Sequence, residues 1–185
     1  MARVKGSALI ARLNFLRDQC TPEQQTRVRA LLSAEMVELL ENGAFASQWY
    51  PLQYLVEFSR AIDQVKGQGD GALLVEMGRR SAGEAVRGIY KIFFKFGSPE
   101  FIIQRAAQVW NRYYDSGQLQ TEVKGKGCVH ITLSAFDTPM HEHCLSVLGW
   151  IQGVVEASGA KNVEAKVLQC RRQGARVCSF EARWQ

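Results

Sequence analysis

The chain has 185 residues, of which 46% are hydrophobic and 22% are charged, and its formal net charge is +5. These values are those of a globular domain and exclude a disordered, fibrous or collagen-like chain. No apolar run approaches the ~18 residues that cross a bilayer, and no signal peptide is visible at the N-terminus. We therefore expect one cytoplasmic domain over residues 1–185, without a membrane span.

Residues 1–116 have the apolar spacing and start signals of a helical region. The Thr21-Pro22 pair begins a helix with a capping threonine and a proline at the first position, and Ser98-Pro99 begins another in the same way. Glycines between residues 67 and 71 break the pattern. The sequence predicts about five helices, over 7–19, 21–43, 49–66, 72–96 and 98–114.

The hydrophobic period changes to two after residue 116. Apolar residues alternate with polar ones over 119–123 and 129–135, around a Lys-Gly-Lys-Gly turn, which predicts a hairpin. A helix over 138–158 begins at Thr138-Pro139, and a second hairpin joins 163–170 to 178–184. The predicted fold class is α+β, an N-terminal helical layer (1–116) on a four- to five-stranded antiparallel sheet with a crossing helix, in the order β-β-α-β-β over 117–185.

Two glycines of the 138–158 helix, Gly149 and Gly153, are four residues apart and therefore share one stripe. Each glycine costs ~1 kcal/mol of helix stability relative to alanine. We expect this stripe to allow close approach, either to the sheet or to the same helix of a second subunit.

Five cysteines in a chain without an export signal predict reduced thiols rather than a disulfide framework. Cys170 and Cys178 flank a tight turn, so their sulfurs are expected to face each other, and a crossing helix brings Cys144 close. Three soft ligands make Cys144, Cys170 and Cys178 a candidate metal site. A structural zinc site takes four ligands, and His141 or Glu142 is a candidate for the fourth.

Catalytic signatures such as Gly-x-Ser-x-Gly, a phosphate loop with its lysine, and Gly-x-Gly-x-x-Gly are absent from the sequence. The three histidines, His130, His141 and His143, are interpreted as surface or capping residues. Basic residues are dispersed apart from a small arginine group in the last turn, so nucleic-acid binding is not expected. We expect a protein that is not an enzyme.

Aromatic residues are concentrated in the helical region, where most are expected to be ordinary core. An aromatic helix layer over a small sheet can also enclose an apolar cavity with a few polar groups. We expect a cavity of ~300 Å³ or more. Its candidate lining residues are Tyr54, Trp110, Tyr113 and Tyr114.

The cysteine positions also carry a resemblance. Residues 117–184 resemble the vinyl-reductase-type small-molecule-binding domain of bacterial aromatic-responsive regulators, which is related to Bet3 subunits of vesicle-tethering complexes. In zinc-bearing members a helix cysteine, a carboxylate-x-x-Cys pair and a cysteine after the turn bind the metal. The resemblance implies these roles for Cys144, Cys170 and Cys178, while the carboxylate position is occupied by Val167. It makes zinc a candidate metal but no cofactor is expected.

Nearly the whole chain, including Trp49-Tyr50-Pro51, Gly97-Ser98-Pro99-Glu100 and Gly149-Trp150, also resembles a paralogous family abundant in myxobacteria, which implies no particular activity. The N-terminal helices are similar to haem-based nitric-oxide sensors. Residues 97–115, where a proximal ligand would lie, contain no histidine, so we do not expect haem.

The function expected from these features is that of a cytoplasmic sensor or regulatory domain that binds a small apolar or aromatic ligand and acts on a partner protein. A homodimer is expected from apolar helix stripes. The alternative is a Bet3-like interaction scaffold whose interior is filled by its own side chains and takes no ligand.

Overall fold

A computed structural model describes residues 1–87, 98–137 and 140–185. The N-terminal elements are β1 (Arg3–Lys5), α1 (Gly6–Gln19), α2 (Pro22–Arg29), α3 (Ala34–Asn42), β2 (Trp49–Pro51), α4 (Leu52–Lys66) and α5 (Ala72–Arg87). The C-terminal elements are α7 (Pro99–Tyr113), β3 (Gln118–Gly125), β4 (Cys128–Ser134), α8 (His141–Ala157), β5 (Glu164–Gln169), a 3-10 turn (Arg171–Gln173) and β6 (Cys178–Arg183).

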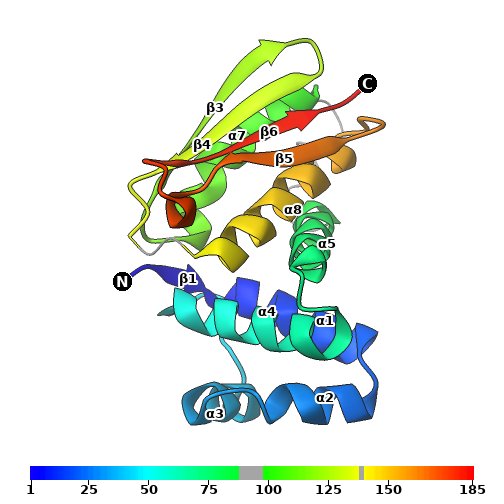
Figure 1. The fold of residues 1–185 in the computed structure, drawn as a ribbon, viewed down its shortest axis with the longest axis vertical. Coiled ribbons are helices and arrows are strands. Elements are labelled where there is room, and N and C mark those ends of the chain that lie inside the picture. The colour runs from blue at the N-terminus through cyan, green and yellow to red at the C-terminus, as the bar shows by residue number, and fades with distance from the viewer. Residues whose placement is uncertain (88–97, 138–139) are drawn as a thin grey trace.

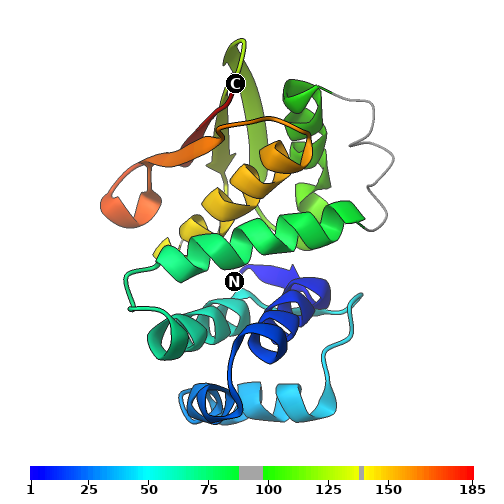
Figure 2. The same ribbon diagram turned by 90° about the vertical axis from the view of Figure 1, so that its right-hand side faces the viewer.

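The predicted α+β class is confirmed. Four antiparallel strands form one sheet in the order β3-β4-β6-β5, and α7 and α8 lie against it (Figure 1). Helices α1 to α4 form the opposite end of the molecule, and α5 runs between the two parts (Figure 2). The sheet turns its alternate apolar residues toward α8: Ile131 pairs with Phe180 and Val129 pairs with Ala182, and all four side chains are fully buried.

Two segments differ from the predicted elements. Trp49–Pro51 is not the start of a helix but strand β2, which pairs with β1 through Val4 opposite Tyr50. A three-residue strand has no visible periodicity, and its partner lies more than forty residues away, so the sequence pattern missed it. The single helix expected over 21–43 is two helices, because Ser33 ends the run and caps α3 by accepting a hydrogen bond from the Met36 backbone N–H at 3.4 Å.

The end of one predicted helix and the start of another lie outside the described residues. The described part of the 72–96 helix is α5, which the structure follows to Arg87. The predicted cap at Thr138 and Pro139 lies outside the described residues, and the described helix α8 begins at His141 with Met140 as its N-cap.

Helices α5 and α8 pack at very close range through glycines. A Cβ added at Gly149 would lie 1.8 Å from the Val75 carbonyl oxygen, and one at Gly78 would lie 2.1 Å from the Ser146 carbonyl oxygen. Gly153 approaches the Arg79 carbonyl in the same way, at 2.5 Å. The close approach expected of Gly149 and Gly153 is therefore real, but its partner is α5 rather than the sheet or a second subunit.

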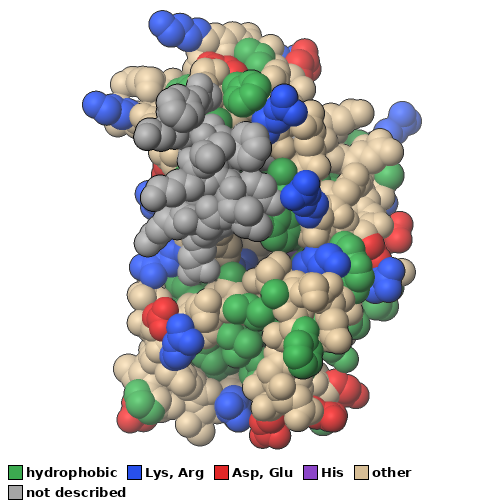
Figure 3. Space-filling view, turned by 180° about the vertical axis from the view of Figure 1, so that it is seen from behind, with side chains coloured by type: hydrophobic (Ala, Val, Ile, Leu, Met, Phe, Trp, Pro, Cys, Tyr) green, Lys and Arg blue, Asp and Glu red, His purple; other side chains and the backbone are tan. Residues whose placement is uncertain are grey.

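Buried apolar residues form two clusters. One lies between the sheet, α7 and α8 and extends to β1, α1, α4 and α5. The other joins α1, α2, α3, α4 and α5 around Phe58, Ile62 and Met77. Seen from behind, hydrophobic side chains also gather on the surface of the helical part (Figure 3). Among the described residues, no helix is long and apolar enough to span a membrane.

Candidate functional site

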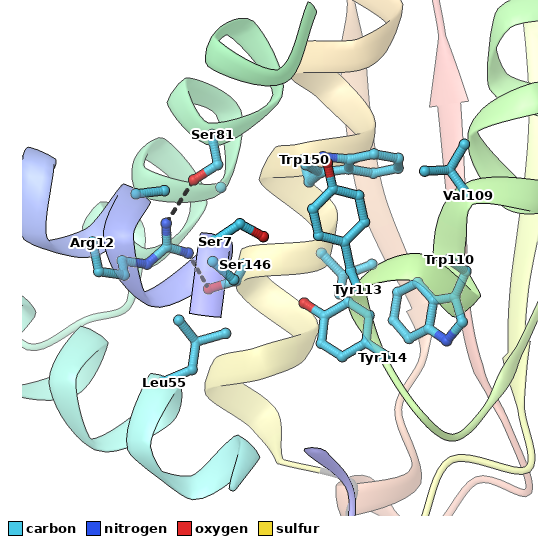
Figure 4. Close-up of a pocket in the computed structure, with 14 residues that line it drawn as sticks. Ser7, Arg12, Leu55, Ser81, Val109, Trp110, Tyr113, Tyr114, Ser146 and Trp150 are labelled. Carbon is cyan, nitrogen blue, oxygen red and sulfur yellow. Dashed lines mark hydrogen bonds between the residues drawn. The ribbon is translucent and has the colours of Figure 1, made fainter. Parts of the chain in front are cut away.

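A cavity of about 230 Å³ lies where the helical part meets the sheet part of the fold. Its walls come from α1, α4, α5, α7 and α8 (Figure 4). It is lined by Ser7, Ala8, Ala11, Arg12, Leu55, Gly78, Ser81, Val109, Trp110, Tyr113, Tyr114, Ser146, Val147 and Trp150. Small residues on α1 and α5 leave this space open, and large aromatic residues close it on the α7 side.

The α7 side of the cavity is a stack of aromatic rings. Trp110 stacks on Tyr114 with ring centroids 4.1 Å apart, and the Trp110 indole N–H donates to the Ser116 carbonyl at 2.9 Å. Trp150 reaches the same side from α8, beside Tyr113 (Figure 4). Stacking and the indole hydrogen bond fix these rings in place, so this wall offers flat apolar faces to a ligand.

The α1 side of the cavity is polar and carries a charge. The Arg12 guanidinium is 4% exposed and donates to Ser59 Oγ at 3.0 Å, Ser81 Oγ at 2.8 Å and Ser146 Oγ at 3.3 Å. It also donates to the Met77 carbonyl at 3.1 Å. These four hydrogen bonds hold the guanidinium at one end of the cavity.

His143 is fully buried behind the aromatic wall. Its ring stacks on Phe136, with centroids 5.0 Å apart, and contacts the Tyr114 ring at 5.0 Å. Burial, with a smaller effect of the Arg12 charge, lowers the pKa of His143 to about 3, so the ring is neutral. Its Nε2 atom has no hydrogen-bond partner among the described residues. The interpretation of His143 as a surface residue is wrong, because His143 lies on the side of the first turn of α8 that faces the core, whereas His141 lies on the exposed side.

Three of the four residues chosen from the sequence, Trp110, Tyr113 and Tyr114, line the cavity. Tyr54 does not line it and packs against the two apolar clusters instead. The cavity is also smaller than the ~300 Å³ expected for a ligand pocket.

The polar wall was missed, although the sequence contains a signal for it. Arg12 follows Leu9 by three residues and precedes Leu16 by four, so it lies on the buried stripe of α1. A charged residue on the apolar face of a helix is rarely buried unless it has polar partners, so its presence there indicates a polar site in the interior.

The three cysteines singled out from the sequence come together beneath α8. Cys144 Sγ lies 3.4 Å from Cys178 Sγ and 3.9 Å from Cys170 Sγ, and all three side chains are buried. The Arg171 backbone N–H donates to Cys178 Sγ at 3.5 Å. Within the described chain, no histidine or carboxylate completes this group as a fourth ligand.

The cysteine cluster favours one thiolate. The hydrogen bond from the Cys144 thiol, assisted by the Arg171 backbone N–H, lowers the pKa of Cys178 below that of an ordinary thiol. The same hydrogen bond and burial raise the pKa of Cys144. The hydrogen bond between the two sulfurs therefore favours ionisation of Cys178 over that of Cys144. Val167, at the position of the expected carboxylate, pairs with Phe180 within the sheet.

A second group, Cys128, His130 and Glu181, lies on the other face of the sheet. His130 Nε2 is 2.9 Å from a Glu181 carboxylate oxygen, and that carboxylate also pairs with Lys166 and Arg183. These ion pairs account for the arrangement without a metal.

Comparisons with known proteins place the fold. The chain matches no family model and no curated protein. It is similar to the solved structure of an H-NOX protein from S. oneidensis in its Fe(II)NO state, with a TM-score of 0.72, 14% identity and coverage of 98% of this chain and 99% of that one. An oxygen-binding H-NOX domain related to soluble guanylate cyclases has a TM-score of 0.67, 10% identity and coverage of 98% and 95%. At these identities the likeness shows a shared fold.

These comparisons correct two expectations. The resemblances to the vinyl-reductase-type and Bet3 domains and to the myxobacterial family are wrong, since no family model or curated protein supports them and the structural neighbours are H-NOX proteins. The expectation of no cofactor, with zinc as a candidate and haem excluded, is contradicted by neighbours that are haem proteins, one of them from a study of haem distortion in the H-NOX family. A missing histidine in one segment was too narrow a ground for that exclusion.

The cavity residues fit a haem in their chemistry. Proteins bind haem iron through histidine, cysteine, methionine or tyrosine, and the described lining offers the two phenols of Tyr113 and Tyr114. His143, with its unpartnered Nε2, lies directly behind Tyr114. The volume of about 230 Å³ is below the ~300–1,000 Å³ of pockets for drug-sized ligands, so a haem requires the walls to move apart.

Proposed function

We propose that this protein is a small-molecule sensor domain that binds its ligand in the cavity between α1, α5, α7 and α8. The observation that carries the proposal is the cavity itself, which has an aromatic wall and a charged wall facing each other. A fold shared over nearly the whole chain with H-NOX proteins supports it. The described lining residues include no carboxylate, cysteine or histidine to act as a general base, which supports a role in binding rather than catalysis.

The proposed mechanism is a population shift between two helix arrangements. The cavity borders five helices, so a ligand that contacts α1 and α7 together changes the relative stability of their arrangements. Ion pairs join the two parts of the fold, from Arg60 on α4 to Glu142 on α8 at 2.5 Å and from Arg3 on β1 to Asp115 after α7 at 2.6 Å. A shift of α1 and α4 against α8 alters this seam, which is the surface that a partner protein would read.

If the ligand is a haem, Tyr113 or Tyr114 would hold its iron. The group would then supply an iron centre able to bind a gas. The protein's own contribution would be to orient the ring between Trp110 and Trp150 and to exclude water from it.

Tryptophan fluorescence tests the proposal, because two of the four tryptophans line the cavity. The protein is titrated with hemin and with single-ring and two-ring aromatic compounds, and the absorption of the hemin-treated protein is recorded. We expect saturable quenching or a shift of emission at one ligand per chain. The Ala11→Leu variant, which fills part of the cavity, should weaken binding, whereas Ala46→Leu at an exposed position should not. The same binding in all three proteins would place the ligand elsewhere, and no binding of any compound would refute the proposal.

A further inference from the structure

We infer that Cys144, Cys170 and Cys178 form a binding site for a trivalent, thiol-binding metalloid ion, arsenic(III), which reaches the protein as arsenite. The site lies between the first turn of α8, the end of β5 and the start of β6, and none of the three cysteines lines the cavity. The inference goes beyond the proposed function and does not depend on ligand binding in the cavity.

The first argument is the spacing of the three sulfurs. Cys144 Sγ lies 3.4 Å from Cys178 Sγ and 3.9 Å from Cys170 Sγ, and all three sulfurs lie within 4.8 Å of one another. A bond between a metal and a thiolate is ~2.3 Å long, so three sulfurs bound to one ion at the base of a pyramid lie ~3.3–3.8 Å apart. Small rotations of the side chains therefore let one ion contact all three sulfurs.

The second argument is the number of ligands. Among the described side chains, no fourth sulfur, imidazole or carboxylate joins this group. Thiolates are soft ligands that select soft ions, but zinc in a structural site takes four ligands in a tetrahedron. Arsenic(III) forms three bonds and carries a lone pair in the fourth direction. Three cysteines therefore satisfy arsenic(III) completely, whereas they leave zinc one ligand short.

The third argument is the charge of a buried site. The three cysteines are no more than 3% exposed and belong to the apolar core. Net charge is costly to bury in such surroundings. Three thiolates leave two negative charges around a monovalent ion such as copper(I) and one around a divalent ion, but they neutralise a trivalent ion. A trivalent ion is therefore the one that this apolar environment favours.

Binding is a ligand exchange in which nothing is oxidised or reduced. At neutral pH arsenite is the uncharged acid As(OH)3. Each cysteine thiol gives its proton to one hydroxyl group of arsenic, which leaves as water, and each sulfur forms one bond to arsenic. The products are one neutral arsenic trithiolate and three water molecules.

Access to the site is through the turn of residues 171–177. Cys170 and Cys178 lie at the two ends of this turn, and the Arg171 backbone N–H donates to Cys178 Sγ at 3.5 Å, so the turn contacts the sulfurs directly. Residues 172–174 are exposed to solvent. Local opening of this turn exposes the thiols to a molecule as small as arsenite without unfolding the sheet.

Native mass spectrometry of the wild-type chain tests the inference, with sodium arsenite as the probe. The protein is kept reduced with a phosphine, because a thiol reductant competes for arsenic. Binding through three cysteines adds one arsenic and releases three protons, a gain of about 72 Da, whereas binding through two leaves a hydroxyl on arsenic and gives about 90 Da. We expect one adduct of about 72 Da per chain.

Cysteine variants assign the site. In an arsenite titration followed by the near-ultraviolet absorption of the arsenic–thiolate bonds, Cys170→Ala should bind at least about a hundredfold more weakly, because one of three bonds is lost. Its adduct should gain about 90 Da. Cys128→Ala is the matched control, since Cys128 is outside this group, and it should keep the wild-type affinity and adduct. Circular dichroism shows whether each variant is folded.

Several results would overturn the inference: no wild-type adduct, a wild-type adduct of about 90 Da, or wild-type affinity in folded Cys170→Ala. Displacement of arsenic by an equal concentration of zinc would also overturn it. If Cys170→Ala does not fold, the mass of the wild-type adduct decides alone. The described lining of the cavity contains no cysteine, so none of these results decides the proposed function.

Discussion

Replacing the buried His143 by phenylalanine should make the folded protein more resistant to acid. The folded-state pKa of His143 is about 3, against an ordinary value of 6.5, because burial disfavours the charged ring. The imidazole is therefore neutral in the folded protein at any pH above about 3 and gains a proton below 6.5 only on unfolding. His143 therefore has no effect on the free energy of unfolding above the unfolded-state pKa. As the pH falls from that value toward 3, His143 lowers the free energy of unfolding progressively.

The size of the effect follows from 1.36 kcal/mol per pKa unit. Between about pH 8 and about pH 5, wild-type His143 should cost ~2 kcal/mol of unfolding free energy, because pH 5 lies about 1.5 units below the ordinary value. Phenylalanine keeps the stacking on Phe136 and removes the proton-binding site. The unfolding free energies of wild type and His143→Phe should therefore diverge by ~2 kcal/mol over this range.

Urea denaturation followed by circular dichroism at several pH values provides the measurement. The difference between the two proteins isolates His143, since the other titrating groups are common to both. His141→Gln is the control for the loss of a histidine from α8, because His141 is exposed on the same helix. A wild-type curve that runs parallel to the His143→Phe curve would refute the burial argument.

Three further outcomes are expected. Gly149→Ala should destabilise the protein by ~2 kcal/mol or more, because the clash with the Val75 carbonyl oxygen outweighs the ~1 kcal/mol gain in helix propensity. A variant that is as stable as wild type in urea unfolding would contradict the close packing of α5 on α8. Trp110→Ala should cost ~3 kcal/mol, near the lower end for a core aromatic because one face borders the cavity, and should change ligand preference in calorimetry. The protein should be a homodimer by light scattering at tens of micromolar, as apolar helix surface suggests, and a monomeric mass would reject this.

Local patterns in the sequence were sufficient for the fold class. The alternation of apolar residues in 129–135 marks β4, because one face of that strand is buried against α8 and the other is not. The turn between Cys170 and Cys178 was visible in the same way, and it brings these two residues and Cys144 together. Strand β2 was missed because its stability comes from pairing with β1 across more than forty residues.

The site was harder to derive than the fold, because its parts depend on tertiary packing. The aromatic residues in and directly after α7 are close in sequence, so the sequence alone predicts that they lie together. Arg12 reaches the site only because α1 packs beside α5 and α8. The burial of His143 does not follow from its position in the first turn of a helix, because that position does not tell whether the side chain faces the core or the solvent. The resemblance of residues 117–184 to the vinyl-reductase-type domain was wrong because three cysteine positions do not define a whole fold. The resemblance to the myxobacterial family rested on short motifs, which do not define a fold either.

Native mass spectrometry of the protein purified from cells tests the central claim, that the cavity binds a small molecule, most directly. We expect each chain to carry one added small mass that is lost on denaturation, or to gain one molecule of hemin or of an aromatic compound when it is supplied, with the Ala11→Leu variant carrying less. A chain that shows only its own mass, with and without added ligands, would contradict the account.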